Sequence, residues 1–295
     1  MQCPRLDHFV RFNPNGTVSR CGHMTMAPQF DSLEQMETSK WLRVIKDQFA
    51  QGQWPTECQR CQEVEEIEPS SIRIHALAVD ALETQPDYLQ VGGVLDNVCN
   101  AACQTCSPEC STRIGALMMK KHFPIVDNSN RFWSLPQDRI RHLDINGGEP
   151  SYSKNYKQIL ANLPPNLRTL RLNTNCNIVL DELTAIAERG IEVTVTVSCD
   201  GIGAMHEFMR WPITWDTFYA NLMTYKTMPV KLNLWTTVSI LNVDDLPNIQ
   251  SFARDHGIDH GYAYLKEPAV LDVNNKDQAA VDAYIQQQKQ VRGIV

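Results

Sequence analysis

Short apolar runs alternate with longer amphipathic stretches along the chain from residue 88 onward. The runs predict strands at residues 89–95, 140–145, 167–173, 192–198, 231–240 and 261–265. The amphipathic stretches predict helices at residues 112–122, 155–162, 180–188, 215–225, 243–256 and 278–290. Strand–helix alternation is typical of a parallel sheet or barrel, and these units are too few to close an eight-stranded barrel. The pattern therefore predicts an α/β fold, a partial (β/α)6 barrel over residues 88–295.

The first 75 residues follow a different pattern. They contain four cysteines, a predicted hairpin turn at Asn15-Gly16 and a helical stretch at residues 32–51. Residues 64–83 are first acidic and then apolar, which predicts a helical connector. We therefore expect a small Cys-rich α+β domain at residues 1–75, a connector at residues 76–87, and the barrel after it.

Composition narrows the class of protein. Hydrophobic residues make up 43% of the chain, which suits a soluble core, and no run approaches the roughly 20 apolar residues that span a bilayer. The formal charge of −7 disfavours a nucleic-acid partner. The start of the chain lacks the apolar run of a signal peptide, so we expect a cytoplasmic protein without membrane contact. Ten cysteines in that compartment indicate metal sites rather than disulfides.

Cys99, Cys103 and Cys106 have the spacing C-x3-C-x2-C and follow the first predicted strand of the barrel. Ligands bind at that end of the strands in parallel α/β folds. Three thiolates on one loop can converge on a [4Fe–4S] cluster and leave its fourth iron open to another ligand. The alternative is a structural zinc loop in which Cys110 is the fourth ligand.

The cysteine spacing, with Asn100 after the first cysteine, resembles the radical S-adenosylmethionine (SAM) superfamily. The resemblance implies a partial TIM-like barrel, a catalytic [4Fe–4S] cluster on the three cysteines, and SAM on the open iron. It also implies reductive cleavage of SAM to a 5′-deoxyadenosyl radical that abstracts hydrogen from a substrate. The family usually has an aromatic residue before the third cysteine, where it binds the cofactor. Here that position is Thr105, so the adenine of SAM must pack elsewhere. Trp211, Trp215 and Trp235 are candidates for that contact.

The segment Gly147-Gly148-Glu149-Pro150 follows the second predicted strand of the barrel. Consecutive glycines let a backbone edge approach a ligand closely, and a carboxylate accepts hydrogen bonds from an ammonium group. The segment resembles the superfamily's GGEP motif. The resemblance implies that Gly147, Gly148 and Glu149 bind the amino group of SAM.

Later strand ends carry further resemblances. Asn175 ends a stretch similar to the family's TNG, with Cys176 in place of the glycine. Ser198 and Asp200 lie in a segment similar to the S-x-D-G of members with a Cys-rich extension, and their alternation places them on one face. The resemblance implies that Asn175, Ser198 and Arg210 position SAM, while Asp200 lines the substrate side or supports Ser198. Two cysteines near these strand ends are expected to be small buried side chains, Cys176 and Cys199.

Cys3, Cys21, Cys58 and Cys61 form the pattern C-x17-C-x36-C-x2-C. Their context resembles the SPASM/twitch extensions of the superfamily, although those extensions usually follow the barrel. The resemblance implies a second, auxiliary [4Fe–4S] cluster on these four cysteines. The alternative is a structural zinc knuckle.

The resemblance favours a peptide or protein substrate that is modified after translation. A small metabolite, such as an amino acid or sugar derivative, is the alternative. Dehydrogenation, epimerisation, cross-linking and rearrangement are all open as outcomes, and a reducing partner such as flavodoxin or ferredoxin is implied. A non-catalytic zinc or electron-transfer protein is the hypothesis from a different class, and it predicts no cleavage of SAM.

Overall fold

The computed structural model describes residues 1–119 and 125–293, which form two compact units. The first unit comprises Met1–Leu95, Val126–Asn146 and Leu163–Arg168. The second comprises Asp96–Ile125, Gly147–Asn162 and Thr169–Val295. Each unit carries four of the strands, and most strand pairs are parallel, so the chain has a mixed α/β fold.

The first unit contains a strand run in the order β2-β1-β3-β4. β1 (Phe9–Phe12) pairs antiparallel with β2 (Val18–Ser19) and parallel with β3 (Leu89–Val94), and β3 pairs parallel with β4 (Ile140–Asn146). The predicted hairpin at Asn15-Gly16 is confirmed, and Gly16 has a positive φ of 86° there. The helices of this unit are α1 (Arg5–His8), α2 (Leu33–Thr38), α3 (Lys40–Ala50), α4 (Gln59–Ile67), α5 (Ile72–Asp80) and α7 (Ser129–Trp133).

Two features of this unit differ from the sequence-based expectation. The helix predicted at residues 32–51 is split at Ser39, whose backbone is extended and whose hydroxyl accepts from the Leu42 amide to cap α3. The compact units also do not follow the predicted boundaries at residues 75 and 88. The reason is that β1 lies beside β3, which unites the N-terminal segment with two strands assigned to the barrel.

The second unit contains four parallel strands in the order β5-β6-β7-β8. They are β5 (Thr169–Thr174), β6 (Glu192–Ser198), β7 (Lys231–Val238) and β8 (Asp259–Tyr264). The helices are α6 (Thr112–Met119), α8 (Lys154–Ala161), α9 (Glu182–Glu188), α10 (Ala204–Met209), α11 (Trp215–Thr227), α12 (Leu246–Asp255) and α13 (Gln278–Arg292). Residues 120–122 of the first helix predicted here lie outside the described part of the chain. The remaining strands and helices expected in this unit are present within a few residues of their predicted ends.

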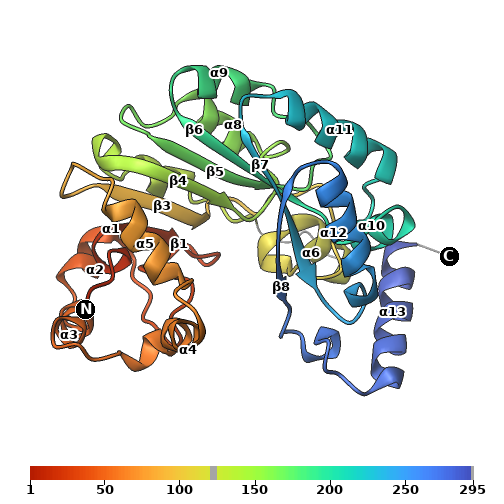
Figure 1. Cartoon of the computed structure of the whole chain (residues 1–295), viewed down its shortest axis with the longest axis horizontal. Helices are drawn as coiled ribbons and strands as arrows, with labels where there is room; N and C mark the ends of the chain where they lie inside the picture. The colour runs from red at the N-terminus through yellow and green to blue at the C-terminus, as the bar shows by residue number, and fades with distance from the viewer. Residues whose placement is uncertain (120–124, 294–295) are drawn as a thin grey trace. The chain divides into compact units, whose positions relative to one another are not determined.

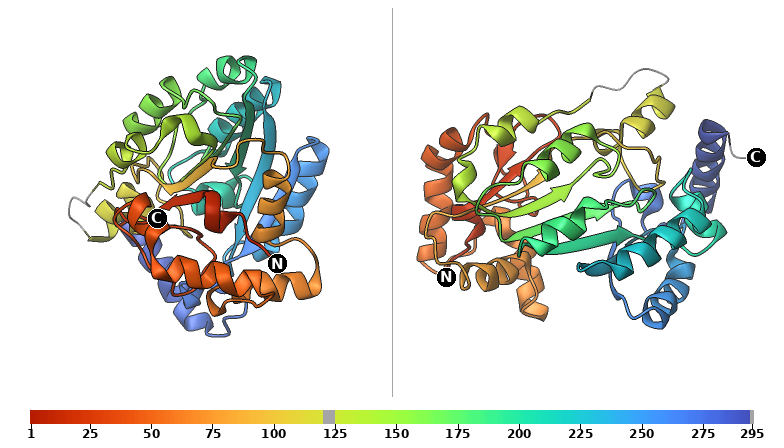
Figure 2. Two further views of the ribbon diagram at one scale, coloured as in Figure 1. Left: turned by 90° about the vertical axis from the view of Figure 1, so that its left-hand side faces the viewer. Right: turned by 90° about the horizontal axis from the view of Figure 1, so that it is seen from above.

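The two faces of the second unit's strands differ in polarity because valine and threonine alternate along β6. Val193, Val195 and Val197 are buried, whereas Thr194 and Thr196 on the other face are partly exposed. Helices such as α9 and α11 cover one side of the strands, as Figure 1 and the view from above in Figure 2 show. The threonine face is therefore free to line a site.

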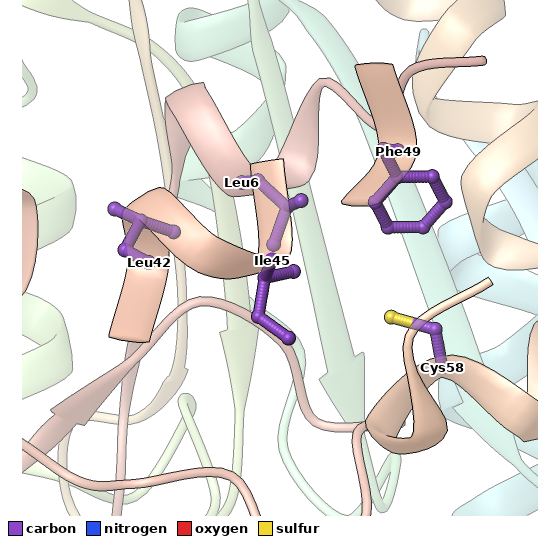
Figure 3. Packing of buried hydrophobic residues seen from close by; sticks show 5 residues of the cluster. All are labelled: Leu6, Leu42, Ile45, Phe49 and Cys58. Carbon is purple, nitrogen blue, oxygen red and sulfur yellow. The ribbon is translucent and has the colours of Figure 1, made fainter. Parts of the chain in front are cut away.

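A small core fixes the helices of the first unit. Leu6, Leu42, Ile45, Phe49 and Cys58 are buried against one another, as Figure 3 shows. Burying a side chain of this size contributes about 1.5–3 kcal/mol, so α1, α3 and the segment before α4 are held as one body. Among the described residues, no helix combines the length and apolar character that crossing a bilayer requires.

Candidate active site

The loop that carries Cys99, Cys103 and Cys106 is held through its own backbone. The Ala102 amide donates to Trp211 O at 2.8 Å, and the Gln104 amide donates to Met209 O at the end of α10 at 2.9 Å. The carbonyls of the loop accept hydrogen bonds from side chains elsewhere in the second unit. Arg113 donates to Asn100 O and Ser111 donates to Ala101 O, each at 2.8 Å. From α13, Arg292 donates to Ala102 O and Tyr284 donates to Gln104 O, each at 3.0 Å. Because these polar groups are satisfied within the protein, the loop has a defined shape of its own.

The thiols of this loop lie close together. Burial, and after it the charges of Cys103 and Glu149, raises the pKa of Cys99 to about 12. The Cys106 thiol is near enough to those of Cys99, Cys103 and Cys110 to interact with them electrostatically. A raised pKa means that Cys99 is a neutral thiol until a metal replaces its proton. The three predicted ligands are thus brought together, and Cys110 lies beside them.

The Gly147-Gly148-Glu149 segment packs against the cysteine loop. The Glu149 amide donates to Val98 O at 2.9 Å, and the Gly148 amide donates to Cys110 O at 3.1 Å. Gly148 has φ +59°, and a Cβ there would lie 2.8 Å from Asp96 O. A larger residue would both strain the backbone and clash, so the sequence must have glycine at this contact.

The Glu149 carboxylate is buried and tied to the end of β5. Its Oε1 accepts from the amide and hydroxyl of Ser151 and from the Thr174 hydroxyl, at 3.1, 2.7 and 2.7 Å. Its Oε2 accepts from the Asn175 amide at 2.7 Å. Burial raises the pKa of Glu149 although these donors act to lower it. Glu149 therefore joins two segments that the sequence predicted as separate SAM contacts.

Asn175 reaches from the end of β5 to the first cysteine. Its Nδ2 donates to Asn100 Oδ1 at 2.7 Å and lies 3.9 Å from Cys99 Sγ. The next residue, Cys176, is fully buried and has φ +62°, a conformation that favours glycine. The backbone of Cys176 thus has the conformation that the glycine of TNG would favour. Cys199 is fully buried as well, so the expectation for both cysteines is confirmed.

Asp200 and Arg210 form a buried ion pair beside the second cysteine. Arg210 Nε lies 2.7 Å from Asp200 Oδ2, and Arg210 Nη1 donates to Cys103 Sγ at 3.5 Å. Asp200 Oδ1 accepts from the Thr237 amide at 2.8 Å. Asp200 is fully buried, and its contact with Arg210 places it beside the second cysteine. Ser198 ends β6, next to Trp235 on β7.

The three tryptophans considered for the adenine lie in different surroundings. Trp215 packs among aromatic rings, with Phe218 at 5.2 Å between centroids. Trp211 is covered by the guanidinium of Arg113 at 4.8 Å. Trp235 is 42% exposed and is the register neighbour of Ser198. Thr105 is partly buried in the cysteine loop.

The N-terminal cysteines converge within the first unit. Cys3, Cys21, Cys58 and Cys61 all line one small cavity of about 20 Å³, together with Trp54. Burial, followed by the charge of Cys21, raises the pKa of Cys3 to about 11. In the described residues no three His, Cys, Asp or Glu side chains are arranged to hold a single metal ion, here or at the loop of Cys99.

Sequence reasoning missed the residues that hold the cysteine loop from a distance. Arg292 and Tyr284 lie on α13, far along the chain from the carbonyls that they bind. Both are polar residues on a helix with several glutamines, a composition typical of solvent-exposed positions. No sequence signal could have paired them with the loop.

No protein-family model matches the chain. A pre-heme d1 synthase from Dinoroseobacter shibae is 27% identical over 126 residues, which are 42% of this chain and 31% of that enzyme. Among solved structures, anSMEcpe with bound AdoMet gives a TM-score of 0.44 at 14% identity, over 60% of this chain and 51% of that one. Streptococcus suis SuiB bound to S-adenosylmethionine gives a TM-score of 0.46 at 11% identity, over 97% of this chain and 70% of that one. The chain thus matches about a third of the synthase and about half of anSMEcpe. These similarities are to an enzyme and to two SAM-bound proteins.

Proposed function

We propose that this chain is a radical SAM enzyme with a catalytic [4Fe–4S] cluster on Cys99, Cys103 and Cys106. The observation that carries the proposal is the meeting of separately expected motifs at one loop. Glu149 bonds to the loop backbone through its amide, Asn175 lies against Cys99 Sγ, and Arg210 donates to Cys103 Sγ. Sulfur donors beside a glycine-lined edge fit a cluster of this type.

A [4Fe–4S] cluster held by Cys99, Cys103 and Cys106 would supply the electron for reductive cleavage of SAM, and thereby the chemistry for hydrogen abstraction from a substrate. The residues of the chain bind and orient SAM. Glu149 Oε2 accepts one hydrogen bond among the described residues and keeps a lone pair for the SAM ammonium. Arg210, held by Asp200, offers a guanidinium to the SAM carboxylate. Asp200 is in this proposal a positioning residue.

In this proposal, Trp235 contacts the adenine of SAM. Thr105 offers no ring, Trp215 packs against other aromatic rings, and Trp235 combines exposure with a place beside Ser198. Aromatic rings stack on nucleobases with about 1–3 kcal/mol per base. The Trp235→Ala variant should therefore raise the KM for SAM about tenfold, and an unchanged KM would remove Trp235 from the site.

The proposed substrate is a peptide or protein, and a small metabolite is the second candidate. SuiB has been solved bound to its precursor peptide SuiA, with a TM-score of 0.45 to this chain at 12% identity, and the synthase that matches in sequence is named for pre-heme d1. An electron-transfer protein such as flavodoxin or ferredoxin would reduce the cluster. A second, auxiliary [4Fe–4S] cluster on Cys3, Cys21, Cys58 and Cys61 completes the proposal, since their thiols share one cavity.

The test is anaerobic reconstitution with iron and sulfide, followed by reduction with dithionite in the presence of SAM. The native chain should become brown and release 5′-deoxyadenosine, and Cys103→Ala should release none. Cys199→Ala serves as the control, because the Cys199 thiol is fully buried and donates to Gly201 O. A colourless protein that binds zinc, or equal release by Cys103→Ala, would contradict the proposal.

A further inference from the structure

One face of the β5–β8 strands is rich in polar side chains. Side chains in register across parallel strands share a face, so the pairing defines rows. The row nearest the proposed SAM site holds Ser198, Trp235 and Gly261. The next two rows hold Asn173, Thr196, Asn233 and Asp259, and then Arg171, Thr194 and Lys231. Trp235 is the large apolar side chain of these rows, and its ring lies over Gly261, where a Cβ would come within 2.8 Å of it.

A cavity of about 660 Å³ lies on the second and third of these rows. Its lining is rich in hydroxyl, amide and charged groups, namely Arg171, Glu192, Thr194, Thr196, Lys231, Asn233 and Asp259, with Leu232 beside them. Pockets for small molecules are mostly apolar and enclose their ligand. This cavity is polar and its charged residues are exposed to solvent, which suits a chain segment better than an enclosed metabolite.

Some charged side chains of the cavity form an ion pair with each other, and others have no partner among the described residues. Lys231 Nζ lies 2.7 Å from Glu192 Oε1, so these two charges offset each other. The Arg171 side chain has no hydrogen bond or ion pair with any described residue, and the same holds for the Asp259 side chain at the other edge. A free guanidinium in a polar cavity is suited to a carboxylate. Asp259 repels a carboxylate from its own edge and thereby directs it to Arg171.

The distance from the proposed SAM site is set by the strand. Thr194, which is level with Arg171, precedes Ser198 by four residues on β6. At about 3.3 Å per residue the two rows are about 13 Å apart. An extended peptide covers that distance with about four residues.

We infer that this cavity binds the substrate, a peptide segment whose carboxylate pairs with Arg171 about four residues from the position that loses hydrogen. The inference rests on the proposed radical SAM function, because that function places the reacting atom near Ser198. Threonine and asparagine side chains on the intervening row supply donors and acceptors to the peptide backbone. The carboxylate belongs either to an Asp or Glu side chain or to a free C-terminus.

Binding of synthetic peptide pools to the immobilised full chain tests the inference. Three pools of about six random residues are compared by mass spectrometry. One is amidated and lacks acidic residues, one is amidated with a single Asp or Glu, and one has a free C-terminus but no acidic residue. The native chain should retain one of the acidic pools about fivefold more than the neutral pool. The pool that is retained identifies the source of the carboxylate.

Variants connect the result to the cavity. Arg171→Gln should lose the preference, and Arg171→Lys should keep part of it. Arg189→Gln, which removes an exposed cation outside the cavity at the C-cap of α9, should behave as native. Equal retention of the three pools, or an unchanged preference in Arg171→Gln, would overturn the inference. The assay needs neither cluster nor SAM. Failure of the native chain to release 5′-deoxyadenosine would therefore count against the proposed function alone.

Discussion

At the scale of single residues, His206 is a buried base without a partner. Its side chain is fully buried, and neither ring nitrogen has a hydrogen bond among the described residues. The Phe218 ring lies 4.1 Å away between centroids. Burial, and after it the charge of Arg210, lowers the pKa of His206 to about 3. His206 is thus an aromatic core residue.

The low pKa of His206 predicts a loss of stability in mild acid. In the unfolded chain the His206 ring takes up a proton near pH 6.5, whereas in the folded chain it stays neutral. The folded state is therefore destabilised relative to the unfolded state as the pH falls below about 6.5. Replacing the ring in His206→Phe removes this linkage. The free energy of unfolding of the native chain, relative to the variant, should fall by about 1 kcal/mol between about pH 6 and pH 5. Urea unfolding at both pH values checks this, and parallel pH profiles would contradict it.

At the scale of elements, α13 is part of the cysteine loop's support. Arg292 is 7% exposed, and besides Ala102 O it bonds to the carbonyl and side chain of Gln288 one turn earlier. Tyr284 adds a hydrogen bond to Gln104 O. The helix also packs against α6, which follows the loop. A buried cation donating to the loop backbone opposes its local unfolding.

Loosening α13 should therefore loosen the cluster. Arg292→Gln should speed the loss of iron to a chelator about fivefold after reconstitution, because the loop opens more often. Arg292→Lys should lose iron at a rate between those of Arg292→Gln and the native chain. Tyr284→Phe removes one hydrogen bond, so it should speed the loss of iron less and lower the free energy of unfolding by about 1 kcal/mol. Gln287→Ala, an exposed change on the same helix, is the control. If Arg292→Gln retains iron as long as the control, α13 has no role in holding the loop.

The contrast between β6 and α13 shows what the sequence could predict. β6 was predicted to its ends because alternating valine and threonine is a local pattern that one buried face imposes. The cysteine loop and the Gly-Gly-Glu segment were found for the same reason, since their residues are adjacent in sequence. Contacts such as Arg292 with Ala102 O depend on how distant elements pack, and no local pattern encodes them. The pairing of β1 with β3 escaped prediction in the same way.

At the scale of the whole molecule, each compact unit contains one complete set of cysteines. Cys99, Cys103, Cys106 and Cys110 all belong to the second unit. The four N-terminal cysteines, Cys3, Cys21, Cys58 and Cys61, all belong to the first. Neither set depends on residues of the other unit for its sulfur ligands. The two proposed clusters can therefore be removed one at a time.

Removing ligands from the first unit should halve the iron content. Cys21→Ser and Cys61→Ser together are the suitable change, because these two residues are only partly buried, whereas Cys58 packs into the core with Leu6 and Phe49. The native chain should bind about eight iron atoms and the double variant about four. Cys176→Ala, which removes a buried thiol outside both sets, should keep the native value. Iron and zinc are measured together after anaerobic reconstitution, since about four iron atoms with one zinc in the native chain would assign the first unit to a zinc knuckle instead.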